Sequence, residues 1–239
     1  MLLLSLTLLL PYPSQGQAKK NSTLTRIDIL NRATALNLAP VGTLIPDIVI
    51  DLKYATRDNF TSQSLYPPDM PCLLHRMTLS RLKQAQKILR KKKLRLKVWD
   101  AYRPPTVHRQ LWAAAKSSTY LVPPEKGLSL HCYGVAVDVT LVDQDGQELL
   151  MPSRHDEFSS SASSTYTGPN KVILRNLKTL QKAMKKAGFS TIKDEWWHFT
   201  NMEAASAKII TAQQLGIQLP GKSTRKAKPV PVAVPITRP

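Results

Sequence analysis

The 239-residue sequence predicts a single α+β domain whose sheet is mostly antiparallel and is flanked by helices. Segments that alternate apolar and polar residues, as strands do, are interspersed with segments whose apolar residues recur at helical spacing. These segments lack the regular strand–helix–strand repetition that builds parallel sheets. An apolar content of 42% is ordinary for a globular protein and argues against wholesale disorder.

The first half of the chain predicts strands and helices joined by a long loop. In order, these are a strand over Leu44–Tyr54, a Pro- and Ser-rich loop over 56–71, a helix from Thr78 or Ser80 to Lys92, a strand over Leu94–Val98 and a helix from His108 to Ala115. In the first strand Ile48, Ile50 and Leu52 fall on one face. The second strand leads directly into Asp100–Arg103.

The second half predicts the rest of the sheet and one long helix. Its elements are a strand over Val135–Val142, a turn over Asp143–Gly146, a short strand over Glu148–Met151, a flexible loop over 159–170, a helix from Lys171 that Gly188 stops, and a strand pair over Phe189–Ile192 and Trp196–Thr200. The turn faintly resembles a calcium loop, but Arg154 stands where that loop needs a bidentate Glu, so we reject calcium.

The two ends of the chain differ from the middle. The apolar run Leu2–Leu10 is far shorter than the roughly 20 residues that span a bilayer. With small residues up to Ala18 it predicts a signal peptide over 1–18, although no basic residue precedes the run. We therefore expect a periplasmic or secreted protein, or a cytoplasmic one if the leader is not used. Residues 220–239 are basic and Pro-rich and predict a disordered tail, which leaves 19–219 for the domain.

The net charge of +18 comes from 34 Lys and Arg against 16 Asp and Glu. The excess is concentrated in the tail and between Arg81 and Lys97. A basic surface favours polyanions, so this surface and the tail are candidates to contact anionic wall or membrane polymers. Specific nucleic-acid binding needs a known module or interleaved aromatic residues, and the sequence has neither. The simplest interpretation is a solvated basic face.

The two cysteines, Cys72 and Cys132, do not form a disulfide framework, and their spacing resembles no zinc knuckle. Either they pair in an exported protein or they are two separate small apolar residues.

Three clusters carry chemistry. In Ser129–Asp138, His131 and Asp138 straddle a Gly turn and can face one another. In Glu195-Trp-Trp-His198 a bend lets both outer residues approach one metal. In Trp99–Pro105, Arg103 sits between a strand and two prolines. Each cluster can also be explained by a purely structural role, such as core packing of the tryptophans or an arginine on the surface.

Together the clusters meet the requirements of a hydrolytic metal site. A catalytic zinc usually takes three protein ligands and leaves a position for water, and two His and one Asp supply such a set. A separate carboxylate, here Glu195, can accept the proton of the water and pass it to the departing amine. A fixed guanidinium, here Arg103, can bind the oxygen on which negative charge builds up.

From about Asp47 to Asn201 the sequence resembles the D-alanyl-D-alanine dipeptidases, zinc peptidases related in fold to zinc D,D-carboxypeptidases and to the Hedgehog signalling domain. The matching pieces, in family order, are Asp51–Phe60, Cys72–Leu74, Asp100–Pro104, Ser129–Asp138, Met151–Phe158 and Glu195–Phe199. The resemblance implies one Zn²⁺ per chain held by His131, Asp138 and His198. It further implies Glu195 as general acid/base toward the zinc-bound water, Arg103 as transition-state stabiliser, and Asp156 and Ser129 as substrate-pocket residues.

The implied reaction is hydrolysis of the dipeptide D-Ala-D-Ala to two D-alanines. A carboxylate at Asp156 can pair with the free ammonium of a dipeptide, and a pocket built for that ammonium excludes longer peptides. The alternative is a zinc D,D-carboxypeptidase or endopeptidase that acts on peptidoglycan stem peptides. An inert zinc-stabilised binding domain is the third possibility, but such a domain is expected to lose Glu195 or Arg103. Leu130, Pro152 and His155 depart from the family pattern and bear on fine specificity.

Overall fold

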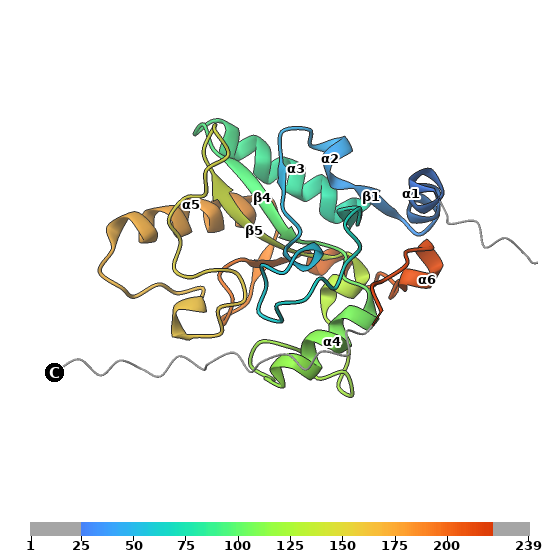
Figure 1. The fold of residues 1–239 in the computed structure, drawn as a ribbon. Helices are drawn as coiled ribbons and strands as arrows, with labels where there is room; N and C mark the ends of the chain where they lie inside the picture. Colours follow the sequence, from blue (N-terminus) through green and yellow to red (C-terminus); the bar gives the residue numbers. More distant parts are fainter. Residues whose placement is uncertain (1–24, 222–239) are drawn as a thin grey trace, which may run out of the picture.

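The computed structural model describes residues 25–221, so the expected signal peptide over 1–18 and almost all of the expected tail over 220–239 lie outside the described residues. Within residues 25–221 the α+β prediction is confirmed: a mostly antiparallel sheet packs against helices (Figure 1). No helix in this part of the chain is both long and apolar enough to span a bilayer.

The central sheet has five strands in the order β2-β4-β5-β7-β6. These strands are β2 (Val49–Ile50), β4 (Arg95–Asp100), β5 (Ala136–Val142), β6 (Ser190–Thr191) and β7 (His198–Thr200). All neighbours are antiparallel except β2 and β4, which run parallel. β5 is buried along its whole length, because strands flank it on both edges and its two faces are covered.

Two long amphipathic helices, α3 (Arg76–Arg90) and α5 (Lys171–Lys186), pack against each other and against the central sheet. Their inward faces are apolar: Leu82 of α3 and Leu180 of α5 are fully buried. The Asn170 side chain caps α5 by accepting hydrogen bonds from the amides of its first turn. Gly188, at a φ of 89°, follows the last turn as the sequence predicts.

A smaller unit of short elements lies beside this core. It contains α1 (Arg26–Ala35), the strand pair β1 (Leu38–Pro40) and β3 (Leu73–His75), α2 (Val41–Leu44) and, from the far end of the domain, α6 (Ala212–Leu215). α1 and α6 contact each other, at the right of Figure 1, and both begin with a capping box. The remaining elements are α4 (Pro105–Ala115) and the 3₁₀ turns η1 (Lys53–Ala55), η2 (Leu130–Tyr133), η3 (Ser160–Ala162) and η4 (Met202–Ala204).

Several expected boundaries are wrong. The strand expected over Leu44–Tyr54 shrinks to Val49–Ile50, because Leu44 ends α2, a turn follows from Ile45 to Ile48, and η1 takes up the last residues. α3 begins at Arg76, directly after β3, so neither Thr78 nor Ser80 caps it.

Four further expectations need correction. α4 begins at Pro105, a residue suited to the first helical position, and not at His108. The strand expected over Glu148–Met151 is reduced to one bridge between Val142 and Glu148. The expected loop over 159–170 contains η3, and Trp196 and Trp197 form a turn before β7.

The two cysteines are free and buried, so the interpretation of two separate apolar residues holds. Burial raises the pKa of the Cys132 thiol to about 12, which keeps this sulfur protonated and unreactive.

Candidate metal centre and active site

Three adjacent strands bring acidic and imidazole side chains into one row across the sheet. Asp138 in the middle of β5 pairs with Asp100 on β4 and with His198 on β7. Cross-strand partners of this kind project from the same face of a sheet. The row is therefore a direct product of strand register, which the hydrophobic neighbours of these residues hold in place.

His131 reaches the row from η2, just before β5. The chain reverses at Gly134, whose φ is 68°, and a Cβ there would stand 2.7 Å from a Leu38 methyl carbon. Glycine is thus required both by the left-handed backbone and by the close approach of β1. Ser129 caps η2, because its Oγ accepts a hydrogen bond of 3.4 Å from the amide of His131.

The imidazoles of His131 and His198 converge with the carboxylate of Asp138. His131 Nε2 lies 3.2 Å from Asp138 Oδ1, His198 Nδ1 lies 3.0 Å from the same oxygen, and the two nitrogens are 3.2 Å apart. All three side chains are buried, and their ligand atoms lie within 4.8 Å of one another. Two nitrogens and one oxygen at this spacing could hold a metal ion.

The hydrogen bonds behind the imidazoles fit a metal. His131 Nδ1 donates to the carbonyl of Ala101 over 2.7 Å, which leaves the lone pair of Nε2 directed at the site. His198 Nε2 lies 3.1 Å from Thr200 Oγ1, which accepts a hydrogen bond when Nε2 carries the ring proton. In that tautomer the lone pair of His198 Nδ1 faces the site. Burial and the neighbouring His131 lower the pKa of His198, which favours the neutral form that binds metal.

Glu195 enters from the turn before β7. The His198 amide donates to the Glu195 carbonyl, and this turn puts both side chains on the same side, with Glu195 Oε2 3.7 Å from His198 Nδ1. Burial, with Asp138 and Asp156 nearby, raises the pKa of Glu195 well above its ordinary value. A carboxylate with a raised pKa accepts a proton more readily, as a general base must.

Arg103 follows β4 and is buried on the other side of Asp138. Its Nε donates to Asp100 Oδ2 over 2.8 Å, and its Nη2 lies 3.6 Å from Asp138 Oδ2. Burial alone would lower the pKa of Arg103, but Tyr54 and Asp100 raise it well above its ordinary value. The guanidinium is therefore permanently charged, and it is held by the Asp100 carboxylate and by the ring of Tyr54.

Asp100 anchors this arrangement, and the sequence analysis assigned it no role. It has no exposed surface and accepts hydrogen bonds from Tyr66 and Arg103 of 2.7 and 2.8 Å. Its position at the end of a strand, three residues before Arg103, was the available signal. The Tyr66 contact could not be foreseen, because the loop over 56–71 carries no periodic pattern.

Asp156 is buried next to the row formed by Asp100, Asp138 and His198, and its backbone adopts the left-handed conformation with a φ of 55°. Its Oδ2 accepts a hydrogen bond of 2.7 Å from the Tyr54 hydroxyl. Burial raises the pKa of Asp156, although His155 and Tyr54 oppose this shift. Among the described residues no hydrogen bond to Asp156 Oδ1 is formed, and the cationic groups near this carboxylate are His155 and Arg103.

His155 lies between Asp156 and Asp138. Its Nε2 lies 3.3 Å from Asp138 Oδ2 and its Nδ1 lies 3.4 Å from Asp156 Oδ2. The ring is packed against Trp99 and Trp197, with centroids 5.3 and 5.5 Å away. His155, which departs from the family pattern, thus lies between two carboxylates of the site.

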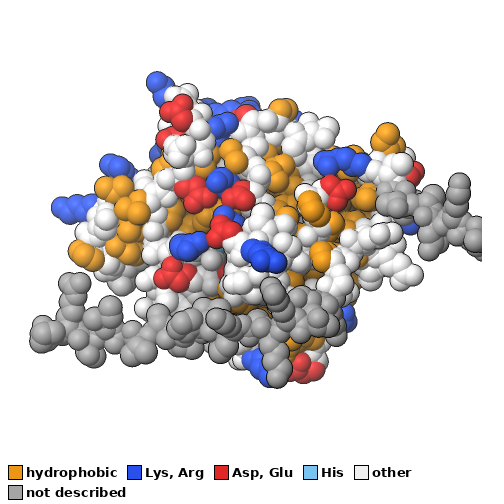
Figure 2. Space-filling model, in the orientation of Figure 1, with side chains coloured by type: hydrophobic (Ala, Val, Ile, Leu, Met, Phe, Trp, Pro, Cys, Tyr) orange, Lys and Arg blue, Asp and Glu red, His pale blue; other side chains and the backbone are white. Residues whose placement is uncertain are grey.

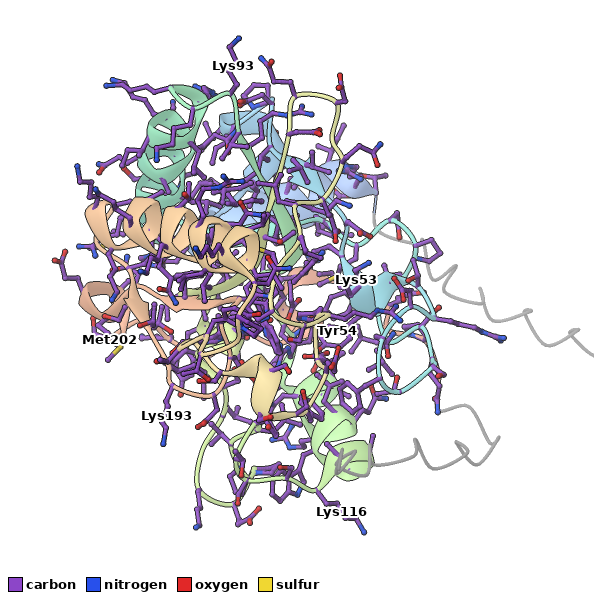
Figure 3. The ribbon with its side chains drawn as sticks, turned by 90° about the vertical axis from the view of Figure 1, so that its left-hand side faces the viewer. Lys53, Tyr54, Lys93, Lys116, Lys193 and Met202 are labelled. Atoms are coloured by element: carbon purple, nitrogen blue, oxygen red, sulfur yellow. The ribbon has the colours of Figure 1, made fainter. Side chains whose placement is uncertain are left out.

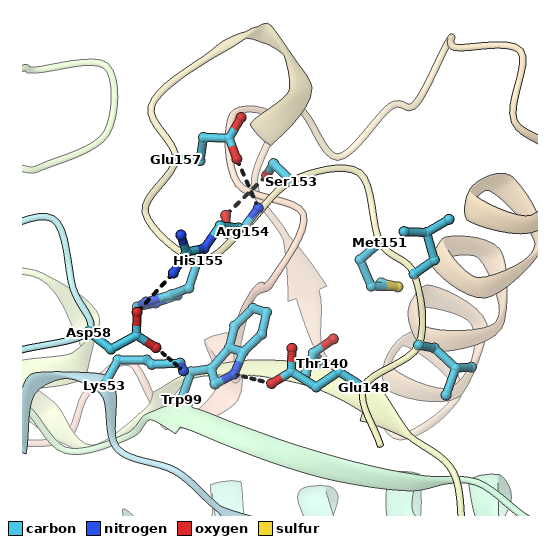
Figure 4. A pocket seen from close by; sticks show the side chains of 12 residues that line it. Lys53, Asp58, Trp99, Thr140, Glu148, Met151, Ser153, Arg154, His155 and Glu157 are labelled. Atoms are coloured by element: carbon cyan, nitrogen blue, oxygen red, sulfur yellow. Dashed lines mark hydrogen bonds and ion pairs between the residues drawn. The ribbon is translucent and has the colours of Figure 1, made fainter. Parts of the chain in front are cut away.

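His155 also lines a cleft of about 490 Å³, together with Lys53, Asp58, Trp99 and Glu148 (Figure 4). The charges of this cleft are paired within the protein: Lys53 Nζ lies 2.8 Å from Asp58, and the Trp99 indole donates to Glu148 over 3.3 Å. The three candidate ligands do not line it. The cleft therefore lies beside the candidate metal centre and shares only the His155 wall with it.

The sequence-predicted site residues thus fall into two groups. His131, Asp138, His198, Glu195, Arg103 and Asp156 come together in one buried site. The second group has a local structural role: Ser129 caps η2. Asn59, in the matching piece Asp51–Phe60, holds its own loop, because its side-chain amide donates to the backbone carbonyls of Lys53, Thr56 and Gln63.

Comparison with known proteins bears on the family to which the chain belongs. A protein-family model described as D-ala-D-ala dipeptidase matches residues 34–215. The D-alanyl-D-alanine dipeptidase of Escherichia coli (strain K12) is 34% identical over 176 residues, which cover 74% of this chain and 90% of that protein. A protein of the same name from Enterococcus faecalis is 29% identical over 62% of this chain and 83% of its own length. A third, from Synechocystis, is 31% identical over 38% of this chain and 39% of its own length.

Proposed function

Since the chain belongs to the D-ala-D-ala dipeptidase family of metallopeptidases, we propose that it hydrolyses the dipeptide D-Ala-D-Ala to two D-alanines in a zinc-dependent reaction. The observation that carries this proposal is the convergence of His131 Nε2, His198 Nδ1 and Asp138 Oδ1, with acceptors behind both imidazoles that direct their lone pairs inward.

These three residues would hold one Zn²⁺. When bound, zinc supplies Lewis acidity, which polarises the scissile carbonyl and makes a water molecule more acidic. Asp138 brings one negative charge to the metal, and the imidazoles of His131, His155 and His198 lower the pKa of Asp138 well below its ordinary value against the opposing effect of burial. Asp138 is therefore ionised at neutral pH.

Glu195 moves the proton in this mechanism. It accepts a proton from the attacking water as the water oxygen bonds to the carbonyl carbon, and it donates that proton to the amine nitrogen as the C–N bond breaks. Its raised pKa suits both halves of the transfer. Arg103, charged and fixed by Asp100, faces the oxygen on which negative charge accumulates.

Asp156 gives the site its preference for a dipeptide. Its buried carboxylate can pair with the ammonium of the substrate, and a longer peptide would place a neutral amide there and leave the charge without a partner. The Tyr54 hydroxyl, from a segment 102 residues away, fixes this carboxylate in place. A fixed, buried carboxylate that needs a cationic partner supports the dipeptidase over the alternative, a zinc D,D-carboxypeptidase that cleaves stem peptides.

The test is to measure D-alanine release by the purified full-length chain from D-Ala-D-Ala and, in parallel, from a stem pentapeptide ending in D-Ala-D-Ala. We expect release from the dipeptide and at most about 1% of that kcat/KM with the pentapeptide, within the range by which an unpaired buried charge discriminates. Release from the pentapeptide alone would replace the dipeptidase with the carboxypeptidase.

Asp156→Asn separates the specificity argument from the catalytic one. Loss of the charge should raise KM for the dipeptide and narrow the gap between the two substrates, because the ammonium loses its partner. An unchanged ratio of the two kcat/KM values would remove Asp156 from substrate recognition while leaving the metal-binding residues untouched.

A further inference from the structure

The two long helices α3 and α5 are rich in cations and contain no acidic residue. Residues 76–93, which span α3 and its C-terminal turn, hold eight Lys or Arg and no Asp or Glu. Residues 171–186, which form α5, hold six Lys or Arg and again no acid. These helices carry a large share of the basic excess of the chain, and they carry it within the folded domain.

The cations of α5 form a continuous stripe. Lys171, Arg175, Lys178, Lys182 and Lys185 are separated by steps of four, three, four and three residues, which places them on one face of the helix. All five are exposed, while the opposite face packs inward. A helix of 16 residues is roughly 24 Å long, so the stripe is an extended row of charge.

α3 lies alongside α5 in the antiparallel direction. Near its start, Arg81 donates to the carbonyl of Gly188 at the end of α5, and just past its end Lys92 lies beside Lys171. In Figure 3 the two helices are neighbours on the same side of the molecule, and Figure 2 shows blue side chains projecting where Figure 1 places α5. Lys83 and Lys87 of α3 are also exposed.

Along α5, where Lys92 from the turn after α3 approaches it, is a shallow groove of about 350 Å³, which we call the basic groove. Five cations line it, and Leu174 and Thr179 complete the lining; the cations are Lys92, Lys171, Arg175, Lys178 and Lys182. Among residues 25–221 none of these five forms a salt bridge, whereas Arg81 and Arg90 of α3 pair with Glu203 and Asp47. Like charges three or four residues apart repel each other, so the unpaired stripe raises the free energy of the helix until anions neutralise it.

We propose that the basic groove binds a flexible linear polyanion that carries phosphates along its backbone and bears no bases. The five cations follow one face of α5 and the turn beside it, a linear arrangement that matches a strand of charge. No aromatic side chain lines the groove, so the stacking that holds single-stranded nucleic acid is missing. Four of the five cations are Lys, whose ammonium pairs with a phosphate oxygen as a point charge and needs no bidentate geometry.

None of the groove residues belongs to the candidate active site, so the proposal is independent of the proposed peptidase activity. Binding would hold the peptidase on a phosphate-bearing polymer while leaving the buried site unchanged.

The test uses fluorescently labelled linear polyphosphate and the full-length chain, with anisotropy measured at several salt concentrations. We expect binding that weakens with salt, with a slope of log K against log salt of about −3.5, since each of five neutralised phosphates contributes about −0.7 on a flexible strand. The double variant Lys178→Gln/Lys182→Gln should bind more weakly and lower the steepness of the slope by about 1.4.

The control variant Lys116→Gln/Lys126→Gln makes the same change in charge at exposed lysines away from the groove; Figure 3 places Lys116 at the opposite end of the molecule from Lys93. It should keep the affinity and slope of the unaltered chain, and all variants should release D-alanine at the unaltered rate. Equal weakening in both double variants would overturn the proposal in favour of net charge alone. Tighter binding to a single-stranded oligonucleotide of equal charge, or binding only to anionic phospholipid vesicles, would also overturn it.

Discussion

The hydrogen bond from Tyr54 to Asp156 supports a quantitative prediction. Tyr54→Phe removes only the hydroxyl that donates to Asp156 over 2.7 Å, while the ring that lies 5.2 Å from the Arg103 guanidinium carbon remains. Both partners are buried, so water does not replace the lost donor. A hydrogen bond to a charged group contributes about 1.5–3 kcal/mol, which predicts a loss of that size in the free energy of unfolding.

This loss corresponds to a roughly 10- to 150-fold fall in the folding equilibrium constant. Urea unfolding at pH 7 measures it, and the slope against denaturant should stay unchanged because the exposed surface is the same. The matched control is Tyr120→Phe, which deletes a hydroxyl that donates to the Ser159 carbonyl over 3.3 Å in a part-buried position. We expect the control to lose less than about 1 kcal/mol.

The same variant should also affect the substrate. Without the Tyr54 donor the pKa of Asp156 rises further, since that hydrogen bond opposes the upward shift caused by burial. A smaller ionised fraction at Asp156 raises KM for the dipeptide, and the increase should be larger at lower pH. A free energy of unfolding within about 0.5 kcal/mol of the unaltered chain, together with an unchanged KM, would refute the reasoning about this bond.

The other predictions concern proton transfer, charge and pH. Glu195→Gln should lower kcat by about 10²–10⁴-fold while the bound zinc, measured by mass spectrometry, stays at one per chain; full activity would remove Glu195 from proton transfer. Arg103→Lys should lower kcat by about 10²–10³-fold, because the shorter lysine side chain, held by Asp100, does not reach the substrate oxygen on which negative charge accumulates. An effect on KM alone would contradict a role of Arg103 in stabilising that charge. The Arg90 partner lowers the pKa of Asp47 from 3.8 to about 2, so this half-exposed pair stabilises the fold above pH 4 and loses its effect as pH falls from about 4 to 2. Asp47→Asn should therefore cost less than about 1 kcal/mol at pH 7 and nothing at pH 2, and a difference that persists at pH 2 would argue against the pair.

Local sequence carried most of the information on the catalytic groups. His131 and Asp138 flank a Gly turn, and Glu195 and His198 flank another turn, so their proximity depends on a few intervening residues. Arg103 was identifiable because a strand and two prolines fix its position. These patterns and the resemblance to the dipeptidases together predicted the donor set of His131, Asp138 and His198.

Contacts between distant segments could not be predicted in the same way. Tyr54 and Asp156 are 102 residues apart, and Tyr66 reaches Asp100 from a loop without periodicity. The bridge formed by His155 depends on how its own segment, between β5 and η3, packs against Asp138 of β5. Sequence patterns describe single elements, whereas these contacts arise from how the elements pack.

The fold shows the same limit. α3, α5, β4 and β5 are long enough for their periodicity to be read, and their existence was predicted with boundary errors of a few residues. β1, β3 and α6 contain three or four residues each, too few for a repeating pattern to be recognised, so their contacts with other segments specify them. The parallel pairing of β2 with β4 likewise follows from the path of the chain between them.

In the proposed reaction, zinc held by His131, Asp138 and His198 is required for cleavage of D-Ala-D-Ala. This requirement is tested by removing metal from the full-length chain with a chelator and following D-alanine release as zinc is added back. We expect no release from the metal-free chain, a linear recovery that ends at one zinc per chain, and no zinc-dependent recovery for His131→Ala. Full release by the metal-free chain, or full recovery of the His131→Ala variant at one zinc per chain, would contradict it.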